Sequence, residues 1–468
     1  MTAQTPAANP QLIAALNQID AGFDGALDRL LDLLAIPSIS TDPAFKADCV
    51  KAADWLVADL QSMGFEASTR ATPGHPMVVA RHIGDASRPH ILFYGHYDVQ
   101  PVDPLDLWHS DPFAPKVEDT PKGKVIRGRG ASDDKGQLMT FLEACRAWKT
   151  ANGALPFNLT IFFEGEEESG SPSLIPFMEA NAGELTADLA LICDTGLYGH
   201  DTPAIVTMLR GMYKTEITVT GPDKDLHSGM YGGPAMNPIR VLTRILGNLH
   251  DDEGRVTIPG FYDDVKPVPA EVLAQWEALG FDGEAFLREV GLAIPAGEAD
   301  RSALEQIWSR PTAEINGIWG GYTGAGFKTV LPSKADAKLS FRLVPGQDPF
   351  KLGAAFNAWF RAQMPADCKV TFARENGSPA GEMNIAHPAF EAARDALGAE
   401  WGTPAAFVGC GGSIPIAGHF GTVLGMDAML VGFARDDDAI HSPNEKYDVE
   451  CFHKGIRSWA RILDRIAG

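Results

Sequence analysis

Residues 159–168 read LTIFFEGEEE, an apolar run that passes directly into a cluster of glutamates. Clustered carboxylates repel one another unless a positive charge lies among them, so the glutamates indicate either a solvated loop or a metal site. The apolar run before them is short and rich in β-forming residues, as a buried strand would be. The same junction of a β-rich run with polar residues recurs along the first two hundred residues and therefore bears on the fold class.

Helical patterns separate these β-rich runs. The runs include HPMVVARHI, HILFYGHYD, KVIRGRG and ADLALICD, and one of the separating segments is DKGQLMTFLEACRAWK. In that segment Leu138, Leu142, Cys145 and Trp148 fall on one helical face. Strands that alternate with amphipathic helices predict an α/β domain with a helix-covered, largely parallel sheet.

A second pattern begins near Gly211. The segments KTEITVTG, NPIRVLTRILGNLH, KADAKLSFRLVPG, DPFKLGAAFNAWFRAQM and CKVTFARE, with IWGGYTGAGFKTVLP as a further strand, give the order β-α-β-β-α-β. This order predicts a small sheet with two helices on one face, and the acidic tract 250–312 within it predicts a helical insertion. We expect a catalytic domain in two parts, residues 1–210 and 383–468, and an inserted α+β lid and dimerisation domain at 211–382.

The composition limits the partners and the compartment. The formal net charge of -22 argues against nucleic acid or an anionic membrane surface as a partner. The six cysteines are scattered without a Cys-x-x-Cys pair, which is typical of reduced thiols in the cytoplasm. The N-terminal residues lack the pattern of a signal peptide, and the charge-free segment 401–426 is broken by glycine and proline, so we expect a cytoplasmic protein without a membrane span.

The polar residues directly after the apolar runs are the candidates for chemistry, because open α/β sheets bind ligands beyond the carboxyl ends of their strands. Each has a structural alternative: a histidine that only forms a hydrogen bond, an aspartate that caps a helix, or glutamates on a solvated surface. Together they favour a divalent metal site, and their nitrogen and oxygen ligands suit zinc, manganese or cobalt better than magnesium. The candidates are His96, Asp98, Asp133, Asp134, Glu164, Glu166, Glu167, Glu168, Asp194 and His441.

Five segments of the chain resemble the motifs of the co-catalytic zinc metallopeptidase family of carnosine dipeptidases, carboxypeptidase G and aminoacylase. They are GHYDVQP, GRGASDDKG, EGEEESGS, LICD and HSPNEK, and the likeness runs nearly end to end, closest to the cytosolic dipeptidase branch. The resemblance implies two divalent metal ions, with zinc expected. It implies that His96 and Asp194 bind one ion, that Glu168 and His441 bind the other, and that Asp133 bridges the two. Asp98 would orient the His96 imidazole.

The resemblance also selects a general base within the glutamate run. In the family the base directly precedes the metal-binding glutamate, which makes Glu167 the base beside the ligand Glu168. Neighbouring side chains on an extended segment point opposite ways, so two roles for adjacent glutamates are compatible. Glu166 is the alternative, because the run contains three consecutive glutamates. The base would take a proton from the water that bridges the two metals.

Three further positions match substrate contacts of the family. His227 in DLHSG would stabilise the oxyanion, often across a dimer interface, and Arg342 in FRLVPG would bind the substrate carboxylate. Ser413 in GGSIPI would line the carboxyl end of the substrate. The alternatives are a loop histidine and a strand arginine in an ion pair. Gly409 and Cys410 depart from the family, whose members often carry arginine and an acidic or polar residue there.

These matches predict a hydrolase that acts as a homodimer, a metallopeptidase of the dipeptidase type that cleaves dipeptides or very short peptides. One alternative is an amidase of the same fold that removes an acyl or carbamoyl group from an amino acid. Another is a catalytically silent homologue that only binds metal. Nucleotide binding and serine hydrolysis are disfavoured, because GRGASDDKGQ lacks the Gly-Lys-Ser/Thr of a phosphate loop and neither Ser228 nor Ser413 lies in a Gly-x-Ser-x-Gly turn.

Overall fold

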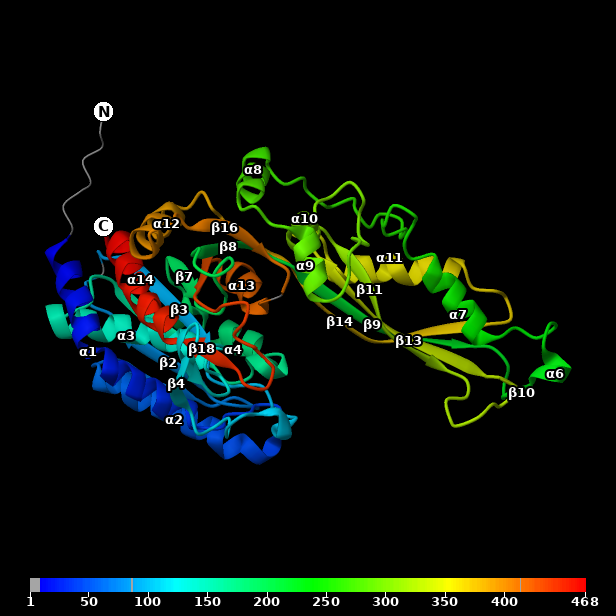
Figure 1. Cartoon of the computed structure of the whole chain (residues 1–468), viewed down its shortest axis with the longest axis horizontal. Helices are drawn as coiled ribbons and strands as arrows, with labels where there is room; N and C mark the ends of the chain where they lie inside the picture. Colours follow the sequence, from blue (N-terminus) through cyan, green and yellow to red (C-terminus); the bar gives the residue numbers. More distant parts are fainter. Residues whose placement is uncertain (1–8, 86, 413) are drawn as a thin grey trace. The chain divides into compact units, whose positions relative to one another are not determined.

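The computed structural model describes residues 9–468 except 86 and 413, and it divides into two compact units (Figure 1). The first unit contains the described residues up to Thr207 together with Met383–Val408 and His419–Gly468. The second unit contains Met208–Glu382 and Gly409–Gly418. The short segment 409–418, which we expected in the catalytic domain, therefore groups with the inserted part of the chain.

A mixed sheet is built mainly from strands of the first unit. Among the described residues its strand order is β1-β2-β6-β3-β7-β17-β8-β15, and β16 pairs with β8. The four strands β6, β3, β7 and β17 are parallel neighbours, whereas β1, β2, β8 and β15 pair antiparallel. The predicted helix-covered α/β sheet is confirmed, with its parallel pairing confined to the centre. The strands are β1 (Glu66–Arg70), β2 (Met77–His82), β3 (His90–His96), β6 (Asn158–Glu164), β7 (Leu189–Ile192), β8 (Ala204–Leu209), β15 (Gly381–Glu382), β16 (Ala406–Cys410) and β17 (Ala428–Gly432).

Three long helices of the first unit, α1, α3 and α14, pack side by side (Figure 1). Asn9 caps the first of them, because its side chain accepts a hydrogen bond from the Gln11 N–H and Pro10 occupies the first helical position. Phe93 of the sheet stacks on Phe141, with 3.7 Å between ring centroids, which joins the helical layer to the strands. The helices of this unit are α1 (Pro10–Leu34), α2 (Lys46–Ser62), α3 (Lys135–Asn152), α4 (Leu174–Ala180), α5 (Ala182–Leu185), α12 (Pro388–Trp401) and α14 (Val449–Ala467). A further short helix, α13 (Pro415–His419), begins in the segment 409–418, which groups with the second unit.

Short elements complete this part of the chain. A three-stranded sheet has the order β18-β5-β4 among the described residues. None of the described helices combines the length and the apolar character that a membrane span requires. These elements are β4 (Lys116–Thr120), β5 (Gly123–Arg127), β18 (Lys446–Asp448), η1 (Pro43–Phe45), η2 (Leu105–Leu107), η3 (Glu167–Ser169) and η4 (Phe420–Leu424).

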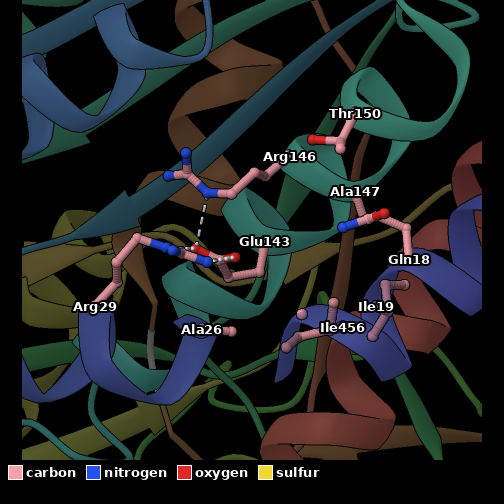
Figure 2. Close-up of a pocket in the computed structure, with 10 residues that line it drawn as sticks. Gln18, Ile19, Ala26, Arg29, Glu143, Arg146, Ala147, Thr150 and Ile456 are labelled. Atoms are coloured by element: carbon pink, nitrogen blue, oxygen red, sulfur yellow. Dashed lines mark hydrogen bonds and ion pairs between the residues drawn. The ribbon is translucent and has the colours of Figure 1, made fainter. Parts of the chain in front are cut away.

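A surface pocket lies among α1, α3 and α14 (Figure 2). Its charged groups are paired with one another: Arg29 and Arg146 both contact Glu143, at 2.6 Å and 3.2 Å. Arg146 also contacts Asp59 at 2.5 Å. Because these ion pairs neutralise the pocket, we assign it a packing role.

The second unit is built on the antiparallel sheet β11-β13-β9-β14. Side chains from one face of this sheet form a core with α7 and α11, as the predicted β-α-β-β-α-β order requires. The tract 250–312 contains three helices, and the strand expected from residue 318 begins earlier, at Thr312. The elements are β9 (Gly211–Thr220), β10 (Leu226–His227), α6 (Ser228–Tyr231), α7 (Pro238–Gly247), α8 (Ala270–Ala278), α9 (Gly283–Glu289), α10 (Ala303–Trp308), β11 (Thr312–Gly320), β12 (Val330–Leu331), β13 (Lys334–Leu343), α11 (Pro349–Ala362) and β14 (Lys369–Ser378).

Candidate dinuclear metal centre

The five predicted metal ligands lie together in the first unit, because the four parallel strands bring their carboxyl ends to one edge of the sheet. His96 is the last residue of β3, and Asp194 follows β7 by two residues. Glu168 lies in η3, shortly after β6, and His441 lies in the loop after β17. Asp133 comes from a different element, the turn before α3.

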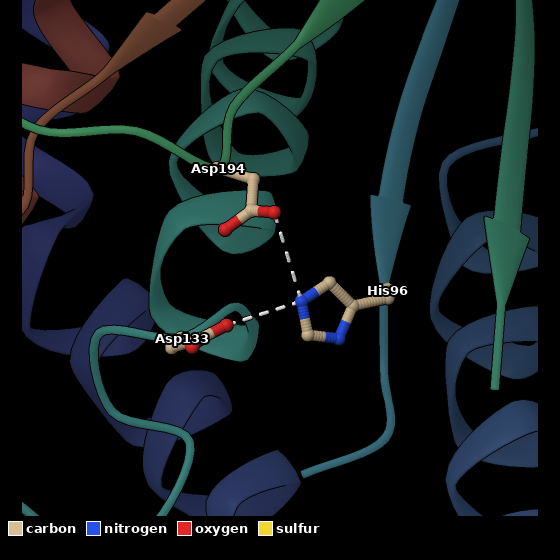
Figure 3. Close-up of side chains that lie close together, drawn as sticks. All are labelled: His96, Asp133 and Asp194. Carbon is tan, nitrogen blue, oxygen red and sulfur yellow. Dashed lines mark hydrogen bonds and ion pairs between the residues drawn. The ribbon is translucent and has the colours of Figure 1, made fainter. Parts of the chain in front are cut away.

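His96, Asp133 and Asp194 form the first group (Figure 3). The His96 Nε2 atom lies 3.1 Å from Asp133 Oδ1 and 4.0 Å from Asp194 Oδ2. The imidazole is almost completely buried, with 1% of its side chain exposed. One nitrogen and two carboxylate oxygens therefore converge on one point, as the ligands of a divalent ion do.

Asp133, Glu168 and His441 form the second group. The His441 Nε2 atom lies 2.9 Å from Asp133 Oδ2 and 3.3 Å from Glu168 Oε2. Asp133 thus turns one carboxylate oxygen toward each histidine. A carboxylate placed in this way can bridge two cations, which is the arrangement of hydrolytic two-metal sites.

A third cluster of carboxylates in the same unit already contains a cation. Asp437, Asp438 and Asp448 lie close enough together to hold a metal ion. The Lys446 Nζ atom, however, lies 2.6–2.7 Å from an oxygen of each of them. The lysine ammonium satisfies this cluster, so we assign it a structural role.

The charges at the two histidine groups suit a cation. Burial alone would lower the pKa of His96, but hydrogen bonds to Asp133 and Asp98 raise it well above its usual value. Hydrogen bonds to Asp133 and Glu168 raise the pKa of His441 to about 10. The carboxylates therefore stabilise positive charge strongly at both histidines. A divalent metal would take the place of those protons.

Two side chains that belong to neither ligand group contact the proposed metal ligands. Asp98 accepts hydrogen bonds from the backbone N–H groups of Glu167, at 3.2 Å, and of Glu168, at 3.0 Å, and its Oδ1 lies 3.4 Å from His96 Nδ1. The Gln100 side chain donates to Glu168 Oε2 at 2.7 Å. Such contacts fix the orientation of metal ligands and are a regular part of metal sites.

The three consecutive glutamates have different surroundings. Glu166 is buried, and its carboxylate accepts hydrogen bonds from the backbone N–H groups of His75, at 3.0 Å, and Ser173, at 3.1 Å. Burial and the neighbouring Glu168 carboxylate raise the pKa of Glu167 to about 7, although His96 opposes the shift. Glu166 is therefore bound to backbone groups, and Glu168 belongs to the second ligand group. Glu167 belongs to neither set, and its carboxylate interacts with the charges of His96 and Glu168.

Two of the predicted substrate contacts, His227 and Arg342, belong to the second unit. His227 ends β10, is exposed, and accepts a hydrogen bond at Nδ1 from the Gly229 N–H at 3.0 Å. Arg342 lies on β13 near Arg210, and burial together with the Arg342 charge lowers the pKa of Arg210 to about 10. Ser413 lies outside the described residues.

Sequence reasoning did not identify Gln100 or Arg210. Gln100 is part of the quoted segment GHYDVQP, so its position beside a metal-binding motif was the available signal. Arg210 follows a strand directly, and its side-chain Nε donates to the Gly411 carbonyl at 3.0 Å. It therefore joins the glycine-rich turn to the strand end, which no local pattern indicates.

The sequence model of the peptidase family M20/M25/M40 matches residues 92–465, most of the chain. The chain belongs to this peptidase family. The Cys-Gly metallodipeptidase DUG1 of Candida albicans is 32% identical over 460 residues, which cover 93% of this chain and 93% of the relative. The human Beta-Ala-His dipeptidase is 28% identical over 482 residues, with 99% and 94% covered.

Solved structures agree with this membership. The M20 family metallo-carboxypeptidase Sso-CP2 of Sulfolobus solfataricus superposes with a TM-score of 0.82 at 31% identity, over 94% of this chain and 99% of that chain. The predicted family, the two-part fold and the enzyme class, a metallopeptidase, are confirmed. The predicted reaction, metal-dependent hydrolysis of a peptide bond, is the reaction of this class.

Proposed function

We propose that the chain is a dipeptidase that uses two divalent metal ions, with zinc as the metal, to hydrolyse peptide bonds in dipeptides. One observation carries the proposal: Asp133 turns its two carboxylate oxygens toward two different histidines, at 3.1 Å and 2.9 Å. His96, Asp133 and Asp194 would hold one ion, and Asp133, Glu168 and His441 the other. The dipeptidase names of two relatives support the substrate class.

The bound ions would supply Lewis acidity to a water molecule and to the substrate carbonyl. Glu167 would accept the proton of the attacking water and then donate it to the leaving amine. Burial raises the pKa of Glu167 above the usual value of a glutamate, which favours proton uptake by this side chain. Asp98 binds the backbone N–H groups of Glu167 and Glu168, so it would hold base and ligand at one spacing.

His227 would stabilise the oxyanion of the tetrahedral intermediate. The Gly229 N–H donates to its Nδ1, which places the remaining proton on Nε2, where it is available for donation. We propose that this histidine acts from the partner subunit of a homodimer formed through the inserted domain. The exposed apolar side chains of Met230 and Tyr231, three and four residues after it, support a contact surface there. A cytoplasmic location stays a prediction, which the six free cysteines support.

Arg342 would bind the free carboxylate of the substrate, and the Arg210 guanidinium nearby adds to the attraction. We expect Arg342→Met to lower kcat/KM for a dipeptide by about 10–1,000-fold, because an ionic hydrogen-bond partner of the carboxylate is lost. Steady-state kinetics with a dipeptide and its C-terminal amide would check this.

The C-terminal amide distinguishes a loss of carboxylate binding from a general loss of activity. The unchanged enzyme should prefer the free acid strongly, whereas the Arg342→Met variant should lose most of that preference. Arg361→Met, at an exposed position on α11, is the matched control and should keep it. An undiminished preference for the free acid in Arg342→Met would exclude this arginine as the carboxylate partner.

The substrate class is tested by a matched panel of a dipeptide, a tripeptide and an N-acyl amino acid with the same C-terminal residue. Metal-stripped protein should be inactive, and added zinc or manganese should restore cleavage of the dipeptide above the other two. Preferential cleavage of the N-acyl amino acid would favour the amidase alternative. Zinc binding without any cleavage would favour the silent homologue.

A further inference from the structure

Glu445 is a buried carboxylate that the proposed mechanism does not use. Its side chain is completely enclosed, with 0% exposed, and it receives four hydrogen bonds. Oε1 accepts from the backbone N–H groups of Ser132, at 2.9 Å, and Asp133, at 3.1 Å. Oε2 accepts from the Gly130 N–H at 2.9 Å and from Arg129 Nη1 at 2.7 Å. Three of the four donors therefore belong to the backbone of the loop that carries Asp133.

Glu445 also belongs to the segment that carries His441. It lies four residues after that histidine, and its backbone carbonyl accepts a hydrogen bond from the Gly128 N–H at 3.1 Å. Its partner Arg129 donates to the Pro101 carbonyl at 3.1 Å, in the segment that follows Asp98 and Gln100. One ion pair thus joins three loops that reach the proposed metal centre.

We propose that Glu445 is a positioning residue that sets the distance between Asp133 and His441 and thereby the affinity of the second metal site. The inference rests on the proposed metal centre. His441 is half exposed, so few side chains pack against its imidazole. Its backbone φ of 61° lies in the left-handed region, which a non-glycine residue keeps only when the surrounding loop holds it there. The Asp133 loop and the His441 loop come from distant parts of the chain, and Glu445 provides a direct bond between them. Ser132 Oγ also donates to Asp438 Oδ2 at 2.7 Å, so loss of the Glu445 bonds would weaken the connection between the two loops and leave Asp133 and His441 less restrained.

Glutamine at position 445 cannot replace the carboxylate. If its NH₂ group took the place of Oε1, it would face the Ser132 and Asp133 N–H donors. If it took the place of Oε2, it would face Gly130 and Arg129. In either orientation the NH₂ group faces other hydrogen-bond donors, so buried N–H groups lose their acceptor. We expect this unfavourable contact to displace the loop.

Glu400 offers a matched control within the same unit. Its side chain is 7% exposed, and it accepts hydrogen bonds from Arg457, at 2.6 Å, and Arg461, at 2.7 Å, at a surface between α12 and α14. Glu400→Gln therefore also removes a buried carboxylate from an arginine pair, but no metal ligand lies among its hydrogen-bond partners.

The test compares Glu445→Gln, Glu400→Gln and the unchanged protein by zinc titration against a competing chelator and by thermal unfolding of the metal-free chains. We expect two zinc ions per unchanged chain. In Glu445→Gln the weaker site should lose about 10–100-fold in affinity, with activity restored by excess zinc at unchanged KM. Glu400→Gln should lower only the melting temperature.

Equal zinc affinities in Glu445→Gln and the unchanged protein would overturn the inference, even if the melting temperature falls. If Glu445→Gln does not fold, Glu445→Asp replaces it, because the shorter side chain keeps the charge but cannot reach both sets of donors; unchanged zinc affinity there has the same meaning. If the unchanged chain does not bind two zinc ions, the proposed metal centre itself fails, which is a different result.

Discussion

Replacement of Glu167 by glutamine should lower kcat by about 10²–10⁴-fold and leave two zinc ions bound per chain. Glutamine keeps the shape of the side chain but cannot accept a proton, so the attacking water and the leaving amine lose their proton carrier. The metal ligands are unaffected, because Glu167 belongs to neither of the two ligand groups. Steady-state kinetics and the zinc content of the purified variant would check both parts.

Glu166→Gln is the control for this experiment, since it changes the neighbouring glutamate. Its carboxylate accepts two backbone hydrogen bonds, from His75 and Ser173, so the expected effect is a lower melting temperature with turnover largely kept. The reverse pattern, in which Glu166→Gln loses turnover and Glu167→Gln keeps it, would move the role of base to Glu166.

Replacement of Asp133 by asparagine should reduce the zinc content from two ions per chain to one or none and abolish dipeptide cleavage. The amide offers one oxygen in place of two, so it can face only one of the two histidines, His96 or His441. Removal of a residue that only orients a metal ligand lowers metal affinity by about 10–100-fold. Asp133→Asn should lower the zinc affinity by more than this, because it removes a ligand oxygen itself. Metal analysis after dialysis would measure it.

Asp437→Asn provides the comparison for the bridging aspartate. Asp437 belongs to the carboxylate cluster that Lys446 occupies, so its replacement should leave zinc content and cleavage unchanged. If Asp133→Asn kept two zinc ions and Asp437→Asn lost zinc, the metals would bind at the Asp437 cluster and not at the two histidine groups.

The proximity of the five proposed ligands could be predicted from the sequence. His96 ends one strand, and Asp194 and Glu168 follow two others. These three strands are parallel neighbours, so their carboxyl ends meet at one edge of the sheet regardless of the loop conformations. The period of the apolar residues likewise predicted the helix that became α3 and the order of elements in the second unit. These features depend on local pattern and on general rules of topology.

Other features depend on loop conformation, which local patterns do not determine. The bonds from Glu445 to the Asp133 loop join residues more than three hundred positions apart in the chain. The different surroundings of Glu166 and Glu167 arise from the single turn in η3, which sends one carboxylate toward His75 and leaves the other near His96. The antiparallel flanks of the main sheet and the grouping of 409–418 with the second unit are long-range pairings of the same kind.

The most direct test of the account is anomalous diffraction from a crystal of the zinc-loaded protein, recorded on both sides of the zinc absorption edge. We expect two zinc peaks per chain, one among His96, Asp133 and Asp194 and the other among Asp133, Glu168 and His441. A single peak, or a peak beside Asp437 and Asp448 with none at the two histidines, would contradict it.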